Sequence, residues 1–256
     1  MAISIGGSGS NGSLGGFVPA LSSSVFNVQP IQGSTIVVGT HWQWETNVND
    51  TVTSVVDNAG NTYTRIQSQS VAGGQRAILY YAKNINTISN FSVTASYTNP
   101  IGAAGIIAVE LKGTDTIAPL DLNSGSGQPT LAAGTDAIII GDMGTPSTNN
   151  QIVIVYTGGN SGVDSYSAGT GYTLIGSSTT PVGRAMEYLL QTTAALVQPR
   201  FTFAGSPLTC TTVAATFKAD GGGGSSISGK PIRIDQLGTI QTRIGSSERN
   251  VFYFNV

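Results

Sequence analysis

Apolar and polar residues alternate in short runs along most of the chain. Most runs are roughly four to eight residues long, rich in Val, Ile, Thr and aromatic residues, and bounded by Gly, Asn, Ser, Asp or Pro. This pattern predicts strands joined by turns. The best candidate for a helix, residues 186–196, is equally compatible with a strand. The clearest runs lie at 33–44, 51–66, 75–82, 91–97, 105–111, 137–141, 151–156, 172–175, 184–190, 199–203 and 211–218.

About ten short strands without helices predict an all-β fold, a jelly-roll-like antiparallel β-sandwich. Within it, Thr51–Ile66 predicts a hairpin, because two β-rich runs flank Asp57-Asn-Ala-Gly-Asn61. Asp and Asn close turns through side-chain hydrogen bonds, and Gly60 supplies a positive φ. The same oxygen-rich loop is a candidate calcium site, but it lacks the terminal glutamate of an EF-hand loop. We favour the turn.

Glycine and serine divide the chain into four parts. Residues 1–16 are rich in both and predict a flexible N-terminal arm, and residues 17–219 carry the strands of the sandwich. Residues 220–229 are a Gly/Ser linker by composition. Residues 230–256 form a β-rich C-terminal tail, predicted to dock or to oligomerise.

Three stretches together resemble a jelly-roll module of phage virion proteins (decoration, fibre or tail) and of bacterial surface proteins. They are Val52–Tyr63, Leu79–Ile85 and Ala108–Gly113. The resemblance covers residues 17–219 and rests on strand and turn signatures, so it implies an architecture. Related modules serve in particle decoration or carbohydrate binding, and the pattern contains no catalytic residue.

Charged residues make up only 9% of the chain, against roughly 25% in an ordinary soluble domain. Gly, Ser, Thr and Asn take their place, as is common on virion and extracellular β-proteins. The net charge of −2 gives no electrostatic footprint for nucleic acid. No stretch approaches the ~18 apolar residues of a membrane span, and the N-terminus lacks the features of a signal peptide. We therefore expect synthesis in the host cytoplasm.

Few residues offer catalytic chemistry. His41 is the single histidine, and no Gly-x-Ser-x-Gly elbow accompanies it. A glycosidase needs two carboxylates about 5–9 Å apart, for which Glu110 and Glu187 are the candidates. Gly221–Gly224 lacks the Lys-Ser/Thr of a phosphate-binding loop. Cys210, the single cysteine, fits a small buried residue. We expect no enzyme, cofactor or metal.

Aromatic residues are the candidates for ligand binding. Trp42 and Trp44 share one face of the alternating segment His41–Glu45. Such a pair forms either a platform for sugar stacking or, as we favour, part of the core. Together with Tyr166 and Tyr172, it is the predicted glycan site of the alternative function, a carbohydrate-binding module.

The tail differs from the rest of the chain in charge. Residues 1–229 carry seven Lys/Arg and eleven Asp/Glu (net −4), whereas residues 230–256 carry four and two (net +2). A solvated tail and a tail docked on an acidic partner are equally open. A docked tail lies on its own body or, as we favour, on a neighbouring chain, because the linker reaches about 15–18 Å. The predicted assembly residues are Arg233, Arg243, Arg249, Phe252, Tyr253 and Phe254.

These features together predict a non-enzymatic structural protein on the surface of a bacteriophage virion. It would be a capsid decoration protein, a head fibre or a tail component, anchored through its terminal arms. The expected partners are other virion proteins, copies of itself in a trimer by family analogy, and host surface glycans. Neither nucleic-acid binding nor membrane insertion is expected.

Overall fold

The computed structural model describes residues 2–43, 52–71, 75–131, 136–138, 140–159, 163–180, 183–205 and 208–221. The chain divides into two units, Met1–Asp220 and Gly221–Val256. The first unit is called the body. The tail predicted over residues 230–256 lies outside the described residues.

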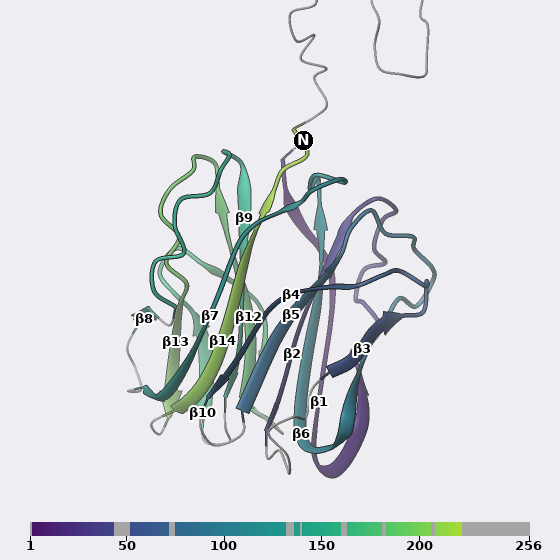
Figure 1. Ribbon diagram of the computed structural model, residues 1–256, viewed down its shortest axis with the longest axis vertical. Coiled ribbons are helices and arrows are strands. Elements are labelled where there is room, and N and C mark those ends of the chain that lie inside the picture. Colours follow the sequence, from purple (N-terminus) through teal and green to yellow (C-terminus); the bar gives the residue numbers. More distant parts are fainter. Residues whose placement is uncertain are drawn as a thin grey trace, which may run out of the picture. The chain divides into compact units, whose positions relative to one another are not determined.

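The described residues of the body form antiparallel strands in three sheets, which confirms the predicted all-β sandwich (Figure 1). The first large sheet contains β1 (Ser4–Ser22), β6 (Val93–Lys112), β2 (Thr35–Gln43), β5 (Gln75–Ala82) and β4 (Thr64–Val71), with β3 (Val52–Asp57) also paired to β6. The second large sheet contains β7 (Leu120–Leu131), β14 (Leu208–Lys218), β9 (Gln151–Gly159), β12 (Gly183–Gln191) and β11 (Thr173–Ser178). A small sheet contains β8 (Asp136–Ile138), β13 (Arg200–Gly205) and β10 (Val163–Ala168).

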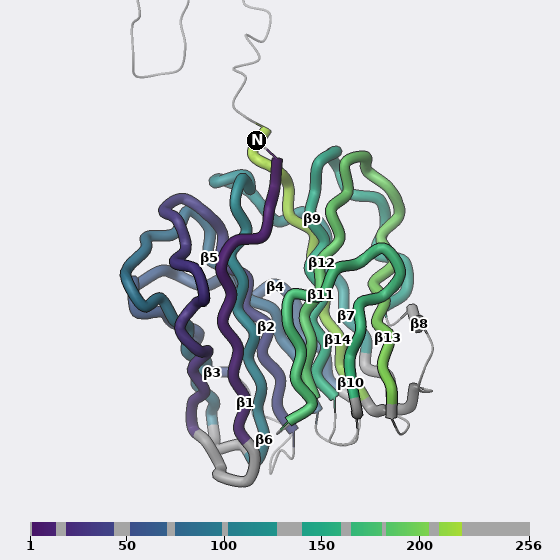
Figure 2. Tube along the Cα trace, turned by 180° about the vertical axis from the view of Figure 1, so that it is seen from behind, coloured from purple at the N-terminus to yellow at the C-terminus, as the bar shows by residue number. Residues whose placement is uncertain are grey.

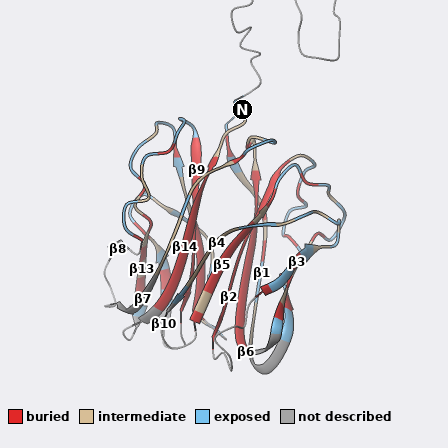
Figure 3. Ribbon diagram, in the orientation of Figure 1, coloured by how far each residue is buried: buried red, intermediate tan, exposed pale blue. Residues whose placement is uncertain are grey.

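Apolar clusters cover both faces of each large sheet. A central cluster lies between the two sheets and includes Leu79 from one and Val213 from the other. Because successive strand residues point to opposite faces, Ile106 and Val153 face two further clusters on the outer sides. β2 and β9 are consequently buried at every position. Figure 3 shows this burial along β2, β5, β9 and β14.

β6 lines both sides of the first outer cluster, and β1 contributes Leu21 to it. Residues 93–97 of β6 pair with β3, whereas residues 103–111 pair with β2. Figures 1 and 2 show both strands curving sharply at one end of the body. Val93 therefore shares the cluster with Ile106 of the same strand.

The two large sheets have the same strand order. It is β1-β6-β2-β5-β4 in the first and β7-β14-β9-β12-β11 in the second. The order β3-β6-β1 beside the first sheet likewise corresponds to β10-β13-β8 beside the second. The body thus contains one arrangement twice, in a first half (residues 2–112) and a second half (residues 120–220).

Strand registers identify the equivalent residues of the two halves. The β4–β5 and β11–β12 ladders each skip one residue, Ile66 in the first and Ile175 in the second. Leu79 and Met186 pair with the residue that follows each skip, so these two are equivalent.

Starting from the equivalent residues Leu79 and Met186, the strand registers identify further equivalent residues across both large sheets. Leu79 pairs with Gly39, and Met186 pairs with Tyr156, so Gly39 and Tyr156 are equivalent. Two residues further along each strand, His41 is equivalent to Gly158.

The equivalence extends to the sheet edges. The backbone N–H of Gly7 donates to Glu110 Oε2 at 3.1 Å, and that of Leu122 donates to Thr216 Oγ1 at 2.9 Å. These are matching positions, and in both halves an oxygen side chain of the penultimate sheet strand holds the edge strand. The repeat therefore includes side-chain contacts as well as topology.

The flexible arm expected over residues 1–16 is wrong from Ser4 onward, where β1 begins. β1 pairs with β6 along the edge of the first large sheet. A side chain at Gly7 would overlap the carbonyl group of Val28. Gly7 and Gly9 lie against the backbone of neighbouring residues, whereas Gly6 and Gly12 leave room for the side chains of Glu110 and Arg184.

The predicted hairpin over residues 51–66 is also wrong. β3 pairs with β6, and β4 pairs with β5. The turn at Asp57–Asn61 instead carries the chain from one side of the first outer cluster to the other.

Candidate functional site

A polar cluster of His41, Tyr156 and Arg184 lies between the two large sheets. His41 is on β2 of the first half, and Tyr156 and Arg184 are on β9 and β12 of the second. All three side chains are buried. The cluster therefore joins the two halves.

A hydrogen bond joins His41 to Tyr156 between the two sheets. His41 Nδ1 lies 2.7 Å from Tyr156 Oη, and the same hydroxyl lies 3.2 Å from the carbonyl oxygen of Gly105. The imidazole tautomer sets which of the two side chains donates. Burial, reinforced by the charge of Arg184, lowers the pKa of His41 to about 3. His41 is thus a neutral cross-link at ordinary pH.

Glycines provide the space for these side chains. A side chain at Gly105 would overlap both His41 and Arg184, and one at Gly158 would overlap His41. Arg184 also fills the space beside Gly12. Sequence reasoning missed this cluster, although isolated glycines inside apolar strands indicate a close approach.

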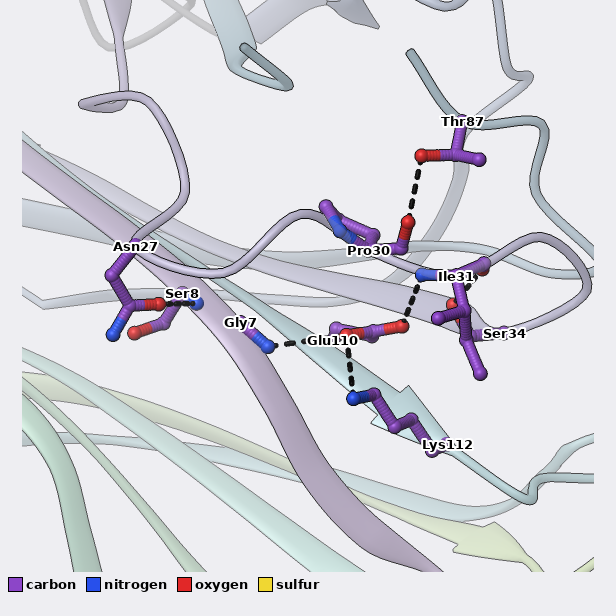
Figure 4. A network of polar contacts seen from close by, with 9 residues as sticks. All are labelled: Gly7, Ser8, Asn27, Pro30, Ile31, Ser34, Thr87, Glu110 and Lys112. Carbon is purple, nitrogen blue, oxygen red and sulfur yellow. Dashed lines mark hydrogen bonds and ion pairs between the residues drawn. The ribbon is translucent and has the colours of Figure 1, made fainter. Parts of the chain in front are cut away.

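Glu110 holds the edge of the first large sheet (Figure 4). Its Oε2 accepts a hydrogen bond from Gly7, and its Oε1 accepts one from the backbone N–H of Ile31 at 2.7 Å. Lys112 Nζ lies 3.7 Å from Oε2. This fully buried carboxylate fastens both β1 and the loop before β2 to β6.

The second candidate carboxylate points away from the first. Glu110 shares the outer face of its sheet with Ile106, and Glu187 shares the outer face of the other sheet with Ala185. Both large sheets lie between them, and packed sheets are about 10 Å apart. Glu187 Oε2 accepts from the N–H of Gly169 at 3.0 Å. This placement contradicts a glycosidase pair.

The loop after β3 is a turn closed by Asp57. Its Oδ1 accepts hydrogen bonds from the backbone N–H groups of Ala59 and Asn61 at 2.9 and 3.0 Å. Its Oδ2 accepts from Asn61 Nδ2 and from Tyr63 Oη. Gly60 has φ +78°. The favoured turn is therefore confirmed.

The predicted sugar-binding aromatics lie mostly inside the protein. Trp42 is 0% exposed and packs edge-on against Tyr97, so its ring offers no face to a sugar. Tyr166 is 6% exposed and packs edge-on against Phe201. The glycan assignment is wrong for Trp42 and Tyr166, and the favoured core placement holds for Trp42.

The other two predicted glycan-binding residues are Tyr172 and Trp44. Tyr172 is half-buried, and its hydroxyl donates to the carbonyl oxygen of Gln198 at 3.3 Å. Trp44 lies outside the described residues, as do Arg233, Arg243, Arg249, Phe252, Tyr253 and Phe254.

Cys210 is buried beside Thr212, as expected of a small core residue. Burial raises the pKa of its thiol to about 11. Within the described ranges, no group of three or more His, Cys, Asp or Glu residues is arranged to hold a metal ion. The described residues also form no helix that is long and apolar enough to span a membrane.

Large apolar side chains are exposed at one end of the body, which we call the loop end. β2 and β9 start there, and β6 and β14 end there. Hydrogen bonding between Asp115 and Lys218 places the ends of both sheets together. Asp220 donates to the carbonyl oxygen of Gly113 at 2.8 Å, so the body ends there too. The loops that reach this end carry exposed side chains at Val28, Ile31, Ile88, Ile117 and Leu196. Exposed Val25 lies further from this end, beside β1, because the neighbouring Ser24 N–H donates to the carbonyl oxygen of Ser10.

No protein-family model, curated protein or solved structure matches this chain.

Proposed function

We propose that the protein is a non-catalytic structural component of a larger assembly, with a bacteriophage virion surface as that assembly. The proposal rests on one observation: the potentially reactive side chains of the body form hydrogen bonds within the fold or are buried. His41, Glu110, Glu187 and Asp57 all accept or donate hydrogen bonds that hold the fold. Cys210 is buried with a raised pKa. A rigid building block uses such groups in this way.

The loop end supports attachment to other proteins. Its apolar side chains are about half exposed or more, for example Val28 at 53% and Ile117 at 78%. The segment that carries Val28 is fixed to β6 by the bond from Ile31 to Glu110. Exposed apolar side chains on a fixed surface favour a protein partner over water.

Sequence features support the choice of a virion. The chain is poor in charge and resembles jelly-roll modules of phage decoration, fibre and tail proteins over residues 17–219. In the sequence, the body is followed by a Gly/Ser linker and then by the basic, aromatic tail. We infer that the loop end and the tail together contact neighbouring virion proteins or further copies of this chain.

Light scattering on the full-length protein and on a version ending at Asp220 tests the proposal. We expect a defined oligomer that becomes a monomer on truncation, while the melting temperature of the body is unchanged. Val28→Lys should weaken the oligomer, and Thr53→Lys, an exposed position on β3, is the matched control. A full-length protein that stays monomeric at high concentration would contradict self-association.

A further inference from the structure

Equivalent residues of the two halves face each other across the central cluster. A side chain at Gly39 would overlap the ring of Tyr156, its own equivalent. A side chain at Gly158 would overlap His41, again its own equivalent. A position that contacts its own equivalent lies on a two-fold axis. Two such positions in succession place this axis between β2 and β9, along the strands.

The remaining sheet contacts follow this symmetry in part. β5 packs on β14, and the equivalent pair β12 and β6 is also in contact, as β2 is with its own equivalent, β9. β4 also packs on β7 and β14, whereas among the described residues β11 makes no contact of comparable extent with the equivalent strands β1 and β6. Along β2 and β9 the two halves therefore meet as the subunits of a two-fold dimer do, and the sheets approach more closely on the β4 side.

The side chains on the axis do not share this symmetry. At each self-facing position a glycine of one half meets a large side chain of the other, Gly39 with Tyr156 and Gly158 with His41. Two copies of the first half would place glycine against glycine at one position and histidine against histidine at the next. Two copies of the second half would place two tyrosines in one space. Close-packed interiors tolerate neither the void nor the overlap.

We infer that the facing sheets are a dimerisation surface, made by duplication of one module, whose partner is now exclusively the other half of the chain. Each half excludes a second copy of itself because its large side chains need the glycines of the other half. This interface is therefore closed to further copies, and higher assembly must use other surfaces. The inference concerns the body alone and does not depend on the proposed function.

Exchanging the side chains on the axis tests both the symmetry and the exclusivity. The full exchange, Gly39→Tyr, His41→Gly, Tyr156→Gly and Gly158→His, places the large side chains on the opposite halves. Thr211→Gly is added wherever Gly158→His is made, because Thr211 is the equivalent of Gly105 and a side chain there would overlap the new imidazole. The pair Tyr156→Gly with Gly158→His gives both halves the residues of the first. The pair Gly39→Tyr with His41→Gly gives both halves the residues of the second. All three are made in the full-length chain and compared by thermal melting.

We expect both symmetric variants to melt at least about 5–10 °C below wild type, because overlap and cavity each destabilise a core of this size. The full exchange carries all of these substitutions, yet it should melt above both of them. A full exchange that melts at or below either symmetric variant, or that alone fails to fold, would overturn the symmetry. Symmetric variants that melt like wild type would overturn the exclusivity.

A milder pair of measurements keeps the test informative if the symmetric variants do not fold. Gly39→Ala is introduced into wild type and into the Tyr156→Gly variant. The added methyl group should lower the melting temperature by about 3–10 °C in wild type and have no such effect where the tyrosine is absent. Gly158→Ala is compared in the same way with and without His41→Gly. Equal effects in both backgrounds would show that the facing residues are not coupled, contrary to the inference.

Discussion

Acid should weaken the body through a single side chain, His41. The chain contains one histidine, so any titration between pH 5 and pH 7.5 is dominated by this residue. An unfolded histidine has a pKa near 6.5, whereas burial between the sheets, with the charge of Arg184 nearby, lowers the pKa of His41 to about 3. Below pH 6.5, His41 is therefore protonated in the unfolded chain but remains neutral in the folded chain.

The size of the effect follows from linkage. Between the two pKa values the free energy of unfolding falls by about 1.4 kcal/mol for each unit of pH. From pH 7.5 to pH 5 the expected loss is about 2 kcal/mol, since little is lost above pH 6.5. The loss continues towards pH 3, where the folded protein also takes up the proton and carboxylates begin to contribute.

Urea denaturation followed by tryptophan fluorescence measures this directly at pH 7.5 and at pH 5. His41→Asn is the matched control, because its amide can still form a hydrogen bond with Tyr156 Oη yet does not titrate. We expect the variant to be less stable at pH 7.5 but to lose almost no further stability at pH 5. If wild type and variant lose the same free energy between these pH values, His41 does not lie neutral between the sheets.

Three further predictions concern single positions in the body. Gly7→Ala should lower the free energy of unfolding by about 1–3 kcal/mol, because the new methyl group overlaps the Val28 carbonyl; Gly176→Ala, with nothing within 4 Å, should cost less than about 0.5 kcal/mol. Equal urea midpoints for these two variants would contradict the packing of β1. Glu110→Gln should cost about 2–3 kcal/mol at pH 7, because one carboxylate oxygen that accepts a backbone N–H becomes a donor. Cys210 should resist a thiol reagent at pH 8 and react only in urea, and rapid labelling of the native protein would refute its burial.

The strands of the body were predictable because buried positions along a strand are mostly apolar, and this produces a recognisable pattern in the sequence. β2 is covered on both faces, so Thr35–Gln43 is buried throughout and begins as an uninterrupted apolar run. Strand pairing was not predictable in the same way. β3 and β4 flank a turn that resembles a hairpin turn, yet they do not pair with each other: β3 pairs with β6, a strand distant in sequence, and β4 pairs with the next strand, β5. Local pattern carries no information about such partners.

The duplication escaped detection because equivalent positions need only keep their burial. Tyr63-Thr-Arg-Ile66 and Tyr172-Thr-Leu-Ile175 are equivalent, and both contain the skipped isoleucine. Elsewhere the equivalent residues differ in size and type, as Glu110 differs from Thr216. A shared register defect therefore reveals the repeat more clearly than shared residue identity does.

Glycine residues indicate different structures in this fold, depending on whether other parts of the protein cover the strand. A glycine-rich segment with no neighbours is flexible, and composition alone assigned residues 4–16 to that class. The structure assigns them to an edge strand whose backbone contacts other backbone. Inside the buried strands, Gly39, Gly105 and Gly158 likewise mark where another side chain enters. His41 attracted attention as a reactive group because it is the single histidine, but the glycines opposite it explain why a histidine is there. In a sheet covered on both faces, an unexpected glycine therefore locates the partner surface, and the polar side chain that fills its space is part of the packing.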